Sequence, residues 1–162
     1  MNADKQISIG WYVFTDYVMA AVAWLLFYVI RSSMANDSGS YPISYRAWLY
    51  ILVIVPAGWL MLYALAGTYT SLYKKSRLAE VTLTFLSTFI GSFVLMFVFV
   101  LNDPHTLSSY YFITSIILIA VHFTLTFSAR YLILNKVKRQ LLSGKVFFNT
   151  LMVGSQYNAI KV

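Results

Sequence analysis

Four long apolar stretches constrain this chain more than any other feature of its sequence. They cover residues 11–30, 48–69, 81–101 and 110–134. Each is close to the roughly 20 residues that a helix needs to cross the hydrocarbon core of a bilayer. Because backbone groups in lipid must form their hydrogen bonds within the protein, and because the runs do not alternate as barrel strands do, we expect helices. The sequence predicts an all-α membrane protein with an up-down bundle of four transmembrane helices.

The composition favours a membrane protein over a soluble domain. Hydrophobic residues make up 60% of the 162 residues and charged residues 10%, against roughly 25% charged in soluble domains. The absence of cysteine excludes disulfides and thiolate metal sites. We interpret residues 1–10 as a cytoplasmic tail, because the apolar run behind them is too long for a signal-peptide core and no small-residue cleavage site follows it.

Lysine and arginine are distributed unequally between the two ends of the expected helices. Only Arg31 and Arg46 fall at one end. The ten others fall at the opposite end: Lys5, Lys74, Lys75, Arg77, Arg130, Lys136, Lys138, Arg139, Lys145 and Lys161. Cytoplasmic segments beside membrane helices carry an excess of Lys and Arg, so both termini are expected in the cytoplasm. The net charge of +7 then matches anionic lipid headgroups better than nucleic acid.

Individual residues predict how the helices bend and pack. Pro56 falls inside the second run, where it removes a backbone hydrogen bond and is expected to kink the helix. Ser87 and Gly91 place two small residues on one face of the third helix, which allows a close approach of another helix. That helix belongs to the same bundle in one interpretation and to a second copy of the chain in the other.

The chain changes character beyond residue 134. The fourth helix is expected to continue to residue 143, with a basic patch of Lys136, Lys138 and Arg139 that contacts either anionic lipid or a cytoplasmic domain. Residues 146–153 are apolar and are closed by Gly154, which predicts a buried strand. A single strand has nothing to pack against, so we expect residues 144–162 to begin a cytoplasmic domain of a longer protein.

Charged side chains within or next to the apolar runs are candidate functional residues, because a charge is costly to place in a membrane. Asp16, Arg130, Arg77 and Glu80 all fall near the cytoplasmic ends of the expected helices, so that they can converge in one layer. Three interpretations remain open: a structural ion-pair layer, a lipid-phosphate or headgroup site, and a proton-coupled transport site. The headgroup site would combine Arg77 and Arg130 with the basic patch. Asp16 lies close to the interface, which weakens the transport interpretation.

His122 adds a polar group to this set near the middle of the fourth run. It has no second ligand, so an interhelical hydrogen bond is expected in place of a metal site. The sequence contains no paired-carboxylate site, no nucleophile beside a base, no phosphate-binding loop and no zinc spacing. We therefore expect no catalytic residue, no metal and no cofactor in this chain.

Several short motifs occur in a definite order along the chain. They are Asp16-Tyr17, residues 20–24, Trp59, Leu62-Tyr63, residues 67–69, 76–80 and 89–91, His122-Phe123, Thr126-Phe127, Arg130, Gly144 and residues 148–154. This order resembles the N-terminal membrane region of bacterial polyprenyl glycosylphosphotransferases. Those enzymes are the undecaprenyl-phosphate sugar-1-phosphate transferases that initiate exopolysaccharide or O-antigen synthesis. The resemblance covers essentially the whole chain.

The resemblance implies a larger enzyme in the bacterial inner membrane. Four helices would precede a Rossmann-like domain beginning in residues 144–162, and then a magnesium-dependent domain that transfers a sugar-1-phosphate from a nucleotide-diphosphate sugar to undecaprenyl phosphate. This chain would be the membrane anchor and assembly module of that enzyme. Its expected partners are membrane lipids, undecaprenyl phosphate and its own cytoplasmic domains, with a homo-oligomer as a further option. The alternative is a complete small four-helix protein for lipid-linked sugar translocation or small-molecule export.

Overall fold

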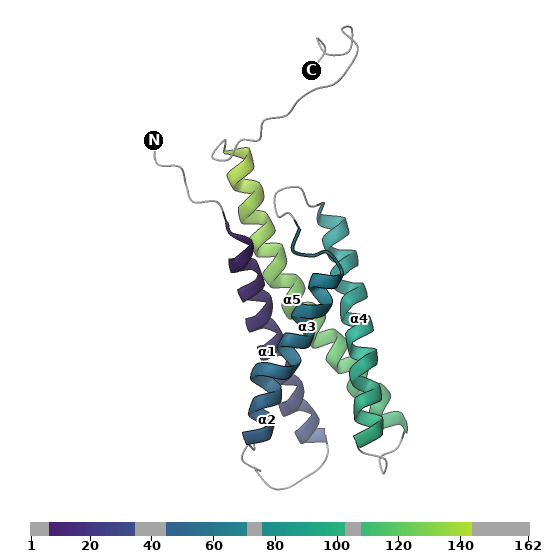
Figure 1. Cartoon of the computed structure of the whole chain (residues 1–162). Helices are drawn as coiled ribbons and strands as arrows, with labels where there is room; N and C mark the ends of the chain where they lie inside the picture. The colour runs from purple at the N-terminus through teal and green to yellow at the C-terminus, as the bar shows by residue number, and fades with distance from the viewer. Residues whose placement is uncertain (1–6, 35–44, 71–75, 103–107, 144–162) are drawn as a thin grey trace, which may run out of the picture.

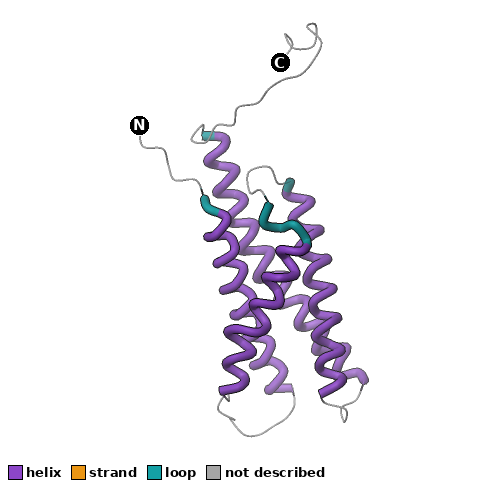
Figure 2. The backbone as a smooth tube through the Cα atoms, viewed as in Figure 1, coloured by secondary structure: helices purple, strands orange, loops and turns teal. Residues whose placement is uncertain are grey.

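The computed structural model describes residues 7–34, 45–70, 76–102 and 108–143, in which every regular element is a helix. The elements are α1 (Ile9–Met34), α2 (Tyr45–Leu49), η1 (Tyr50–Ile54), α3 (Val55–Leu65), α4 (Arg77–Asn102) and α5 (Ser108–Leu142). They form an elongated bundle (Figures 1 and 2). The all-α prediction is confirmed for the described residues.

Three of these helices are long and apolar enough to cross a membrane. The candidate spans are Ile9–Met34, Arg77–Leu101 and Tyr111–Leu142. The elements α2, η1 and α3 follow one another without a break and form a further rod, the second in chain order, which packs against α1 and α4 and runs antiparallel to α1 (Figure 1). This arrangement is that of a multi-pass membrane protein.

The two ends of the bundle differ in charge. Helices α1 and α4 begin, and helices α3 and α5 end, at the upper end of the bundle in Figure 1. We call this the basic end, because the exposed cations Arg77, Lys136, Lys138 and Arg139 lie there. Arg31, in the last turn of α1, and Arg46, in α2, lie at the opposite end.

The second rod ends earlier than the sequence suggests. Its helix stops at Leu65, not at Tyr69, because Gly67 has a φ of +71° and turns the chain out of the helix. The Thr68 amide donates to the Tyr63 carbonyl and the Gly67 amide to the Ala64 carbonyl, both at 3.0 Å. This pair of bonds is the Schellman motif, in which a left-handed glycine closes a helix.

Pro56 changes the helix type just before its own position. Proline has no N–H and its ring crowds the carbonyl four residues earlier, which is that of Leu52. The chain accommodates this with the π-helical turn η1, in which the Val55 amide bonds the Tyr50 carbonyl. The Leu52 carbonyl accepts a hydrogen bond from the Tyr17 hydroxyl of α1. The hydrogen bond to the Leu52 carbonyl, just before Pro56, therefore links the second rod to α1.

The core is formed by one buried stripe on each helix. In α1 the stripe consists of Tyr12, Asp16, Ala20, Ala23 and Phe27, at spacings of three and four residues. Helix α5 packs against both α1 and α4, and α1 also packs against α3. Gly91 of α4 is buried against Trp59 of α3, so the small residue at this position serves packing within the bundle.

The structure tests our predictions for the C-terminal part of the chain only as far as residue 143. Helix α5 does continue as one helix to Leu142, as predicted. The predicted strand over 146–153, and the whole of 144–162, lie outside the described residues. The same holds for Lys5, Lys74, Lys75, Lys145 and Lys161.

Candidate functional site

Arg130 of α5 is the centre of a buried charged cluster near the basic end. Its Nε and Nη2 donate to the two carboxylate oxygens of Asp16 on α1, at 3.0 and 2.7 Å. Its Nη1 donates to Glu80 Oε1 at 3.1 Å and to Thr84 Oγ1 at 2.8 Å, both on α4. One arginine therefore joins three helices, and four of its N–H groups are used in doing so.

Tyrosine side chains surround this cluster. The Tyr12 hydroxyl donates to Glu80 Oε1 at 2.5 Å, and the Tyr69 hydroxyl donates to Asp16 Oδ2 at 3.0 Å. The guanidinium carbon of Arg130 lies 4.0 Å from the centre of the Tyr63 ring. The tyrosines thus supply hydrogen bonds to the carboxylates and an aromatic face to the cation, which together replace the water that all three charges have lost.

The cluster is isolated from solvent, which decides what it can do. Asp16, Glu80 and Arg130 are only 1, 2 and 1% exposed. Burying an ion costs several kcal/mol, and that cost is offset only when the geometry is good and the remaining hydrogen bonds are made. Here Arg130 is bidentate with Asp16, and its Nη1 also bonds Glu80 and Thr84. The geometry favours the structural ion-pair interpretation, because a phosphate would have to displace these partners to reach Arg130.

Local sequence places these side chains on shared faces. Tyr12 and Asp16 are four residues apart in α1, and so are Glu80 and Thr84 in α4. Residues four apart lie one above the other on a helix face. The Thr84 hydroxyl also donates to the Glu80 carbonyl at 2.7 Å, which fixes its oxygen toward Arg130.

Arg77 does not join the layer in which we expected it. Its guanidinium is exposed, and its Nη2 donates to Asn135 Oδ1 on α5 at 2.8 Å. It lies three residues before Glu80 and therefore about 60° around the helix from it. Lys136, Lys138 and Arg139 are also exposed. The predicted headgroup set therefore divides into a buried member, Arg130, and four exposed ones.

His122 lies two turns of α5 away from Arg130, deeper in the bundle. Its Nε2 is hydrogen-bonded to the Tyr63 hydroxyl at 2.8 Å. Its ring stacks on that of Trp59, with 3.8 Å between the centroids. Since Tyr63 also covers Arg130, the two polar positions of α5 are connected through one side chain of α3.

Hydroxyl groups also occur in the core without a hydrogen-bond partner among the described residues. Ser92 of α4 is 1% exposed and its Oγ has no such partner. A buried polar group that makes no hydrogen bond destabilises the fold. This contrasts with Thr84, whose hydroxyl is both donor and acceptor.

We expect Ser92→Ala to raise the free energy of unfolding by up to about 1 kcal/mol, because it removes an unpaired hydroxyl and leaves a better helix former. Thr84→Val is the matched control on the same helix, and should lower it by about 1–3 kcal/mol, because Arg130 loses an acceptor. Thermal unfolding of the purified protein in one detergent measures both. An equal loss of unfolding free energy in Ser92→Ala and Thr84→Val would contradict the expected difference between an unpaired and a paired hydroxyl.

The sequence patterns missed the neutral members of the cluster. Tyr12, Tyr63, Tyr69 and Thr84 carry no charge, and tyrosines near helix ends are usually interfacial anchors. A signal was present for Tyr12 and Thr84, because each lies four residues from a carboxylate. Tyr69 lies beyond the turn at Gly67, outside the helix, and bonds Asp16 from there.

Comparisons of this chain with protein-family models, with curated proteins and with solved structures find no match.

Proposed function

We propose that this chain is a membrane-anchoring and assembly module that holds cytoplasmic domains at the inner face of a bacterial cytoplasmic membrane. The observation that carries the proposal is the length of α5, which has 35 residues in one helix. At a rise of 1.5 Å per residue it is about 52 Å long. The hydrocarbon core is only about 30 Å thick. A helix of this length can continue well past the lipid and act as a rigid connection.

The charged cluster supports this proposal because it fixes the base of that connection. Arg130 lies twelve residues before the last residue of α5 and bonds both α1 and α4. A helix held on two sides at this level transmits its orientation to whatever follows it. The exposed cations of the basic end favour a cytoplasmic location for it.

The finer assignment comes from the order of the sequence motifs. It is that the attached domains transfer a sugar-1-phosphate to undecaprenyl phosphate in exopolysaccharide or lipopolysaccharide synthesis. Anchoring would serve such a reaction, because an enzyme and a lipid-linked acceptor confined to one membrane meet at a higher effective concentration. The described residues would then supply the anchor and its orientation, and the chemistry would take place outside them.

Two measurements test the two levels of the proposal. With a reporter fused after Ser143, we expect green fluorescent protein to fluoresce and alkaline phosphatase to be inactive, because the basic end faces the cytoplasm. The reverse pattern would contradict the orientation. For the transferase, the gene is sequenced beyond codon 162, and membranes carrying its whole product are assayed for transfer of labelled sugar-1-phosphate to undecaprenyl phosphate. A stop codon directly after Val162 would contradict the transferase and the attached domains, whereas the reporter experiment tests the membrane orientation independently of them.

A further inference from the structure

Arg77 is a cation whose described partners are all neutral. It makes no ion pair with any described residue; its guanidinium donates to Asn135 Oδ1 at 2.8 Å and lies 5.8 Å from the centre of the Tyr131 ring. Both partners belong to α5, so Arg77 bridges the start of α4 to the neighbouring helix. The contacts hold the guanidinium in place without neutralising it.

Arg77 is one of the residues that line a small crevice. The crevice has a volume of about 80 Å³ and runs between α4 and α5, with apolar walls formed by Val81, Phe127 and Leu134. Tyr131 also lines it. Glu80 and Arg130 line its inner side, but they are paired with each other there. The crevice therefore combines an apolar wall with one unneutralised cation.

The surroundings of the crevice indicate which surface it faces. Leu78, next to Arg77, is 77% exposed, and Tyr131 is 44% exposed. Exposed apolar side chains on a membrane helix face lipid. Tyrosine is typical of the headgroup level, where its ring lies in the apolar layer and its hydroxyl in the polar one. The site therefore lies where lipid chains end and phosphates begin.

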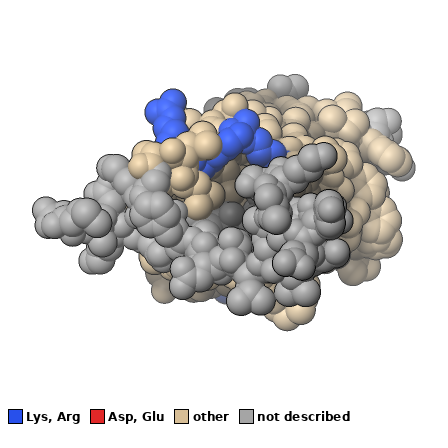
Figure 3. All heavy atoms as spheres, turned by 90° about the horizontal axis from the view of Figure 1, so that it is seen from above, with Lys and Arg blue, Asp and Glu red and all other residues tan. Residues whose placement is uncertain are grey.

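A second cation continues the same face of α5. Lys138 follows Leu134 by four residues and Asn135 by three, so it lies one turn beyond them toward the cytoplasmic side. It is exposed. Figure 3 views the basic end from above and shows Lys and Arg at the surface but no Asp or Glu, in agreement with the burial of Asp16 and Glu80. Nothing acidic in the described surface competes for these cations.

We propose that this crevice is a binding site for an anionic phospholipid. The Arg77 guanidinium binds the phosphate through the N–H groups that Asn135 leaves free, and Lys138 adds a second positive charge on the headgroup side. One hydrocarbon chain lies along Val81, Phe127 and Leu134. Arginine suits this role because its planar donors match phosphate oxygens in pairs. The inference rests on the membrane location of α4 and α5 and is independent of the transferase assignment.

Native mass spectrometry of the detergent-purified protein tests the site. Phosphatidylglycerol and phosphatidylethanolamine with identical chains are the probes, and the bound fraction of each is measured over a concentration series. We expect the wild type to retain phosphatidylglycerol more tightly. Arg77→Gln should weaken its binding about fivefold, as expected for one cation at a membrane surface, and should leave phosphatidylethanolamine binding nearly unchanged.

Lys136→Gln is the matched control, because it removes one exposed cation from the opposite face of the same turn of α5. Equal effects of Arg77→Gln and Lys136→Gln would overturn the site in favour of general charge attraction, and no effect of Arg77→Gln would overturn it outright. Inorganic phosphate is added as a competitor: displacement of the lipid at equal concentration would show a free-phosphate site instead. Unfolding temperatures of both variants are measured first, and Arg77→Met, which also removes the charge, replaces Arg77→Gln if the latter does not fold.

Discussion

Replacement of Arg130 by methionine is expected to lower the free energy of unfolding by about 3–5 kcal/mol. The change leaves Asp16 and Glu80 buried without their cation, at 1 and 2% exposure. Neither carboxylate can reach water without opening the contact of α5 with α1 or α4. Reversible unfolding in mixed micelles with increasing denaturing detergent measures the loss, with helix content as the signal.

The control for this prediction is Arg139→Met, which removes an exposed arginine nine residues further along the same helix. We expect it to change stability by less than about 0.5 kcal/mol, as is usual for surface positions. Arg130→Lys should fall between the two, because an ammonium group keeps the charge but cannot bond Asp16 through two parallel N–H groups. If Arg130→Met behaved like Arg139→Met, the structural role of the cluster would have to be given up.

A charge-free version of the cluster separates the cost of an unpaired charge from the value of the pair. Arg130→Met combined with Asp16→Asn and Glu80→Gln removes all three charges together. We expect this triple variant to be more stable than Arg130→Met alone, because well-packed neutral side chains often replace a buried ion pair with little loss. A triple variant that is less stable than the single one would mean that the hydrogen bonds to Tyr12 and Tyr69 contribute more than the charge balance.

The sequence predicted the level of a side chain along the bundle well and its direction around each helix poorly. Asp16, Glu80 and Arg130 were assigned to one layer from their positions along the runs, and the structure brings all three together. Arg77 lies at a similar level along the bundle, but its guanidinium bonds Asn135 and not the carboxylates of the cluster. The level of a residue along its helix follows from counting residues at 1.5 Å each. The face that a helix turns inward depends on packing against helices far away in the sequence.

The second rod shows a different limit. Its existence follows from apolar length, but its end at Leu65 depends on one positive φ at Gly67. Glycine is compatible with a helix as well as with such a turn, so composition could not distinguish the two. Pro56 correctly predicted an irregularity in the helix, which the structure shows as the π-helical turn η1. The Tyr17 hydroxyl that satisfies the Leu52 carbonyl could not be predicted, because it comes from another helix.

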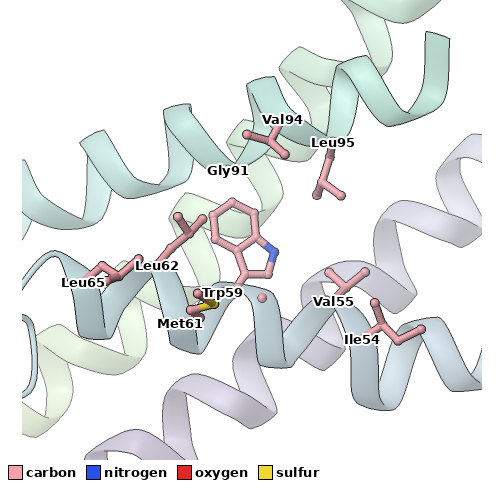
Figure 4. Close-up of a pocket in the computed structure, with 10 residues that line it drawn as sticks. Ile54, Val55, Trp59, Met61, Leu62, Leu65, Gly91, Val94 and Leu95 are labelled. Atoms are coloured by element: carbon pink, nitrogen blue, oxygen red, sulfur yellow. The ribbon is translucent and has the colours of Figure 1, made fainter. Parts of the chain in front are cut away.

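Gly91 provides the second large effect, and the geometry is visible in Figure 4. The Trp59 ring of α3 points at Gly91 of α4, beside an apolar groove of about 330 Å³ between the two helices. A Cβ added at Gly91 would lie 2.4 and 2.5 Å from two atoms of that ring and 3.0 Å from Leu62 Cδ1. The ring cannot move away freely, because one of its faces is stacked on His122.

We expect Gly91→Ala to lower the free energy of unfolding by about 1–3 kcal/mol, the usual cost of overfilling a packed contact. Gly58→Ala is the matched control, because Gly58 lines the same groove and a Cβ there meets no atom within 4 Å. Alanine is the better helix former by about 1 kcal/mol, so Gly58→Ala should be neutral or stabilising. The same detergent unfolding experiment compares the two variants.

The origin of the Gly91 effect can be isolated by making the contact partner smaller. In a Trp59→Leu background the ring is gone, so a methyl group at position 91 should cost far less than it does in the wild type. The difference between the two costs is a coupling energy, and residues in contact typically show 0.5–3 kcal/mol. Equal costs in both backgrounds would mean that Gly91 is required for another reason, and the close approach of α4 to α3 at Trp59 would then not explain the glycine.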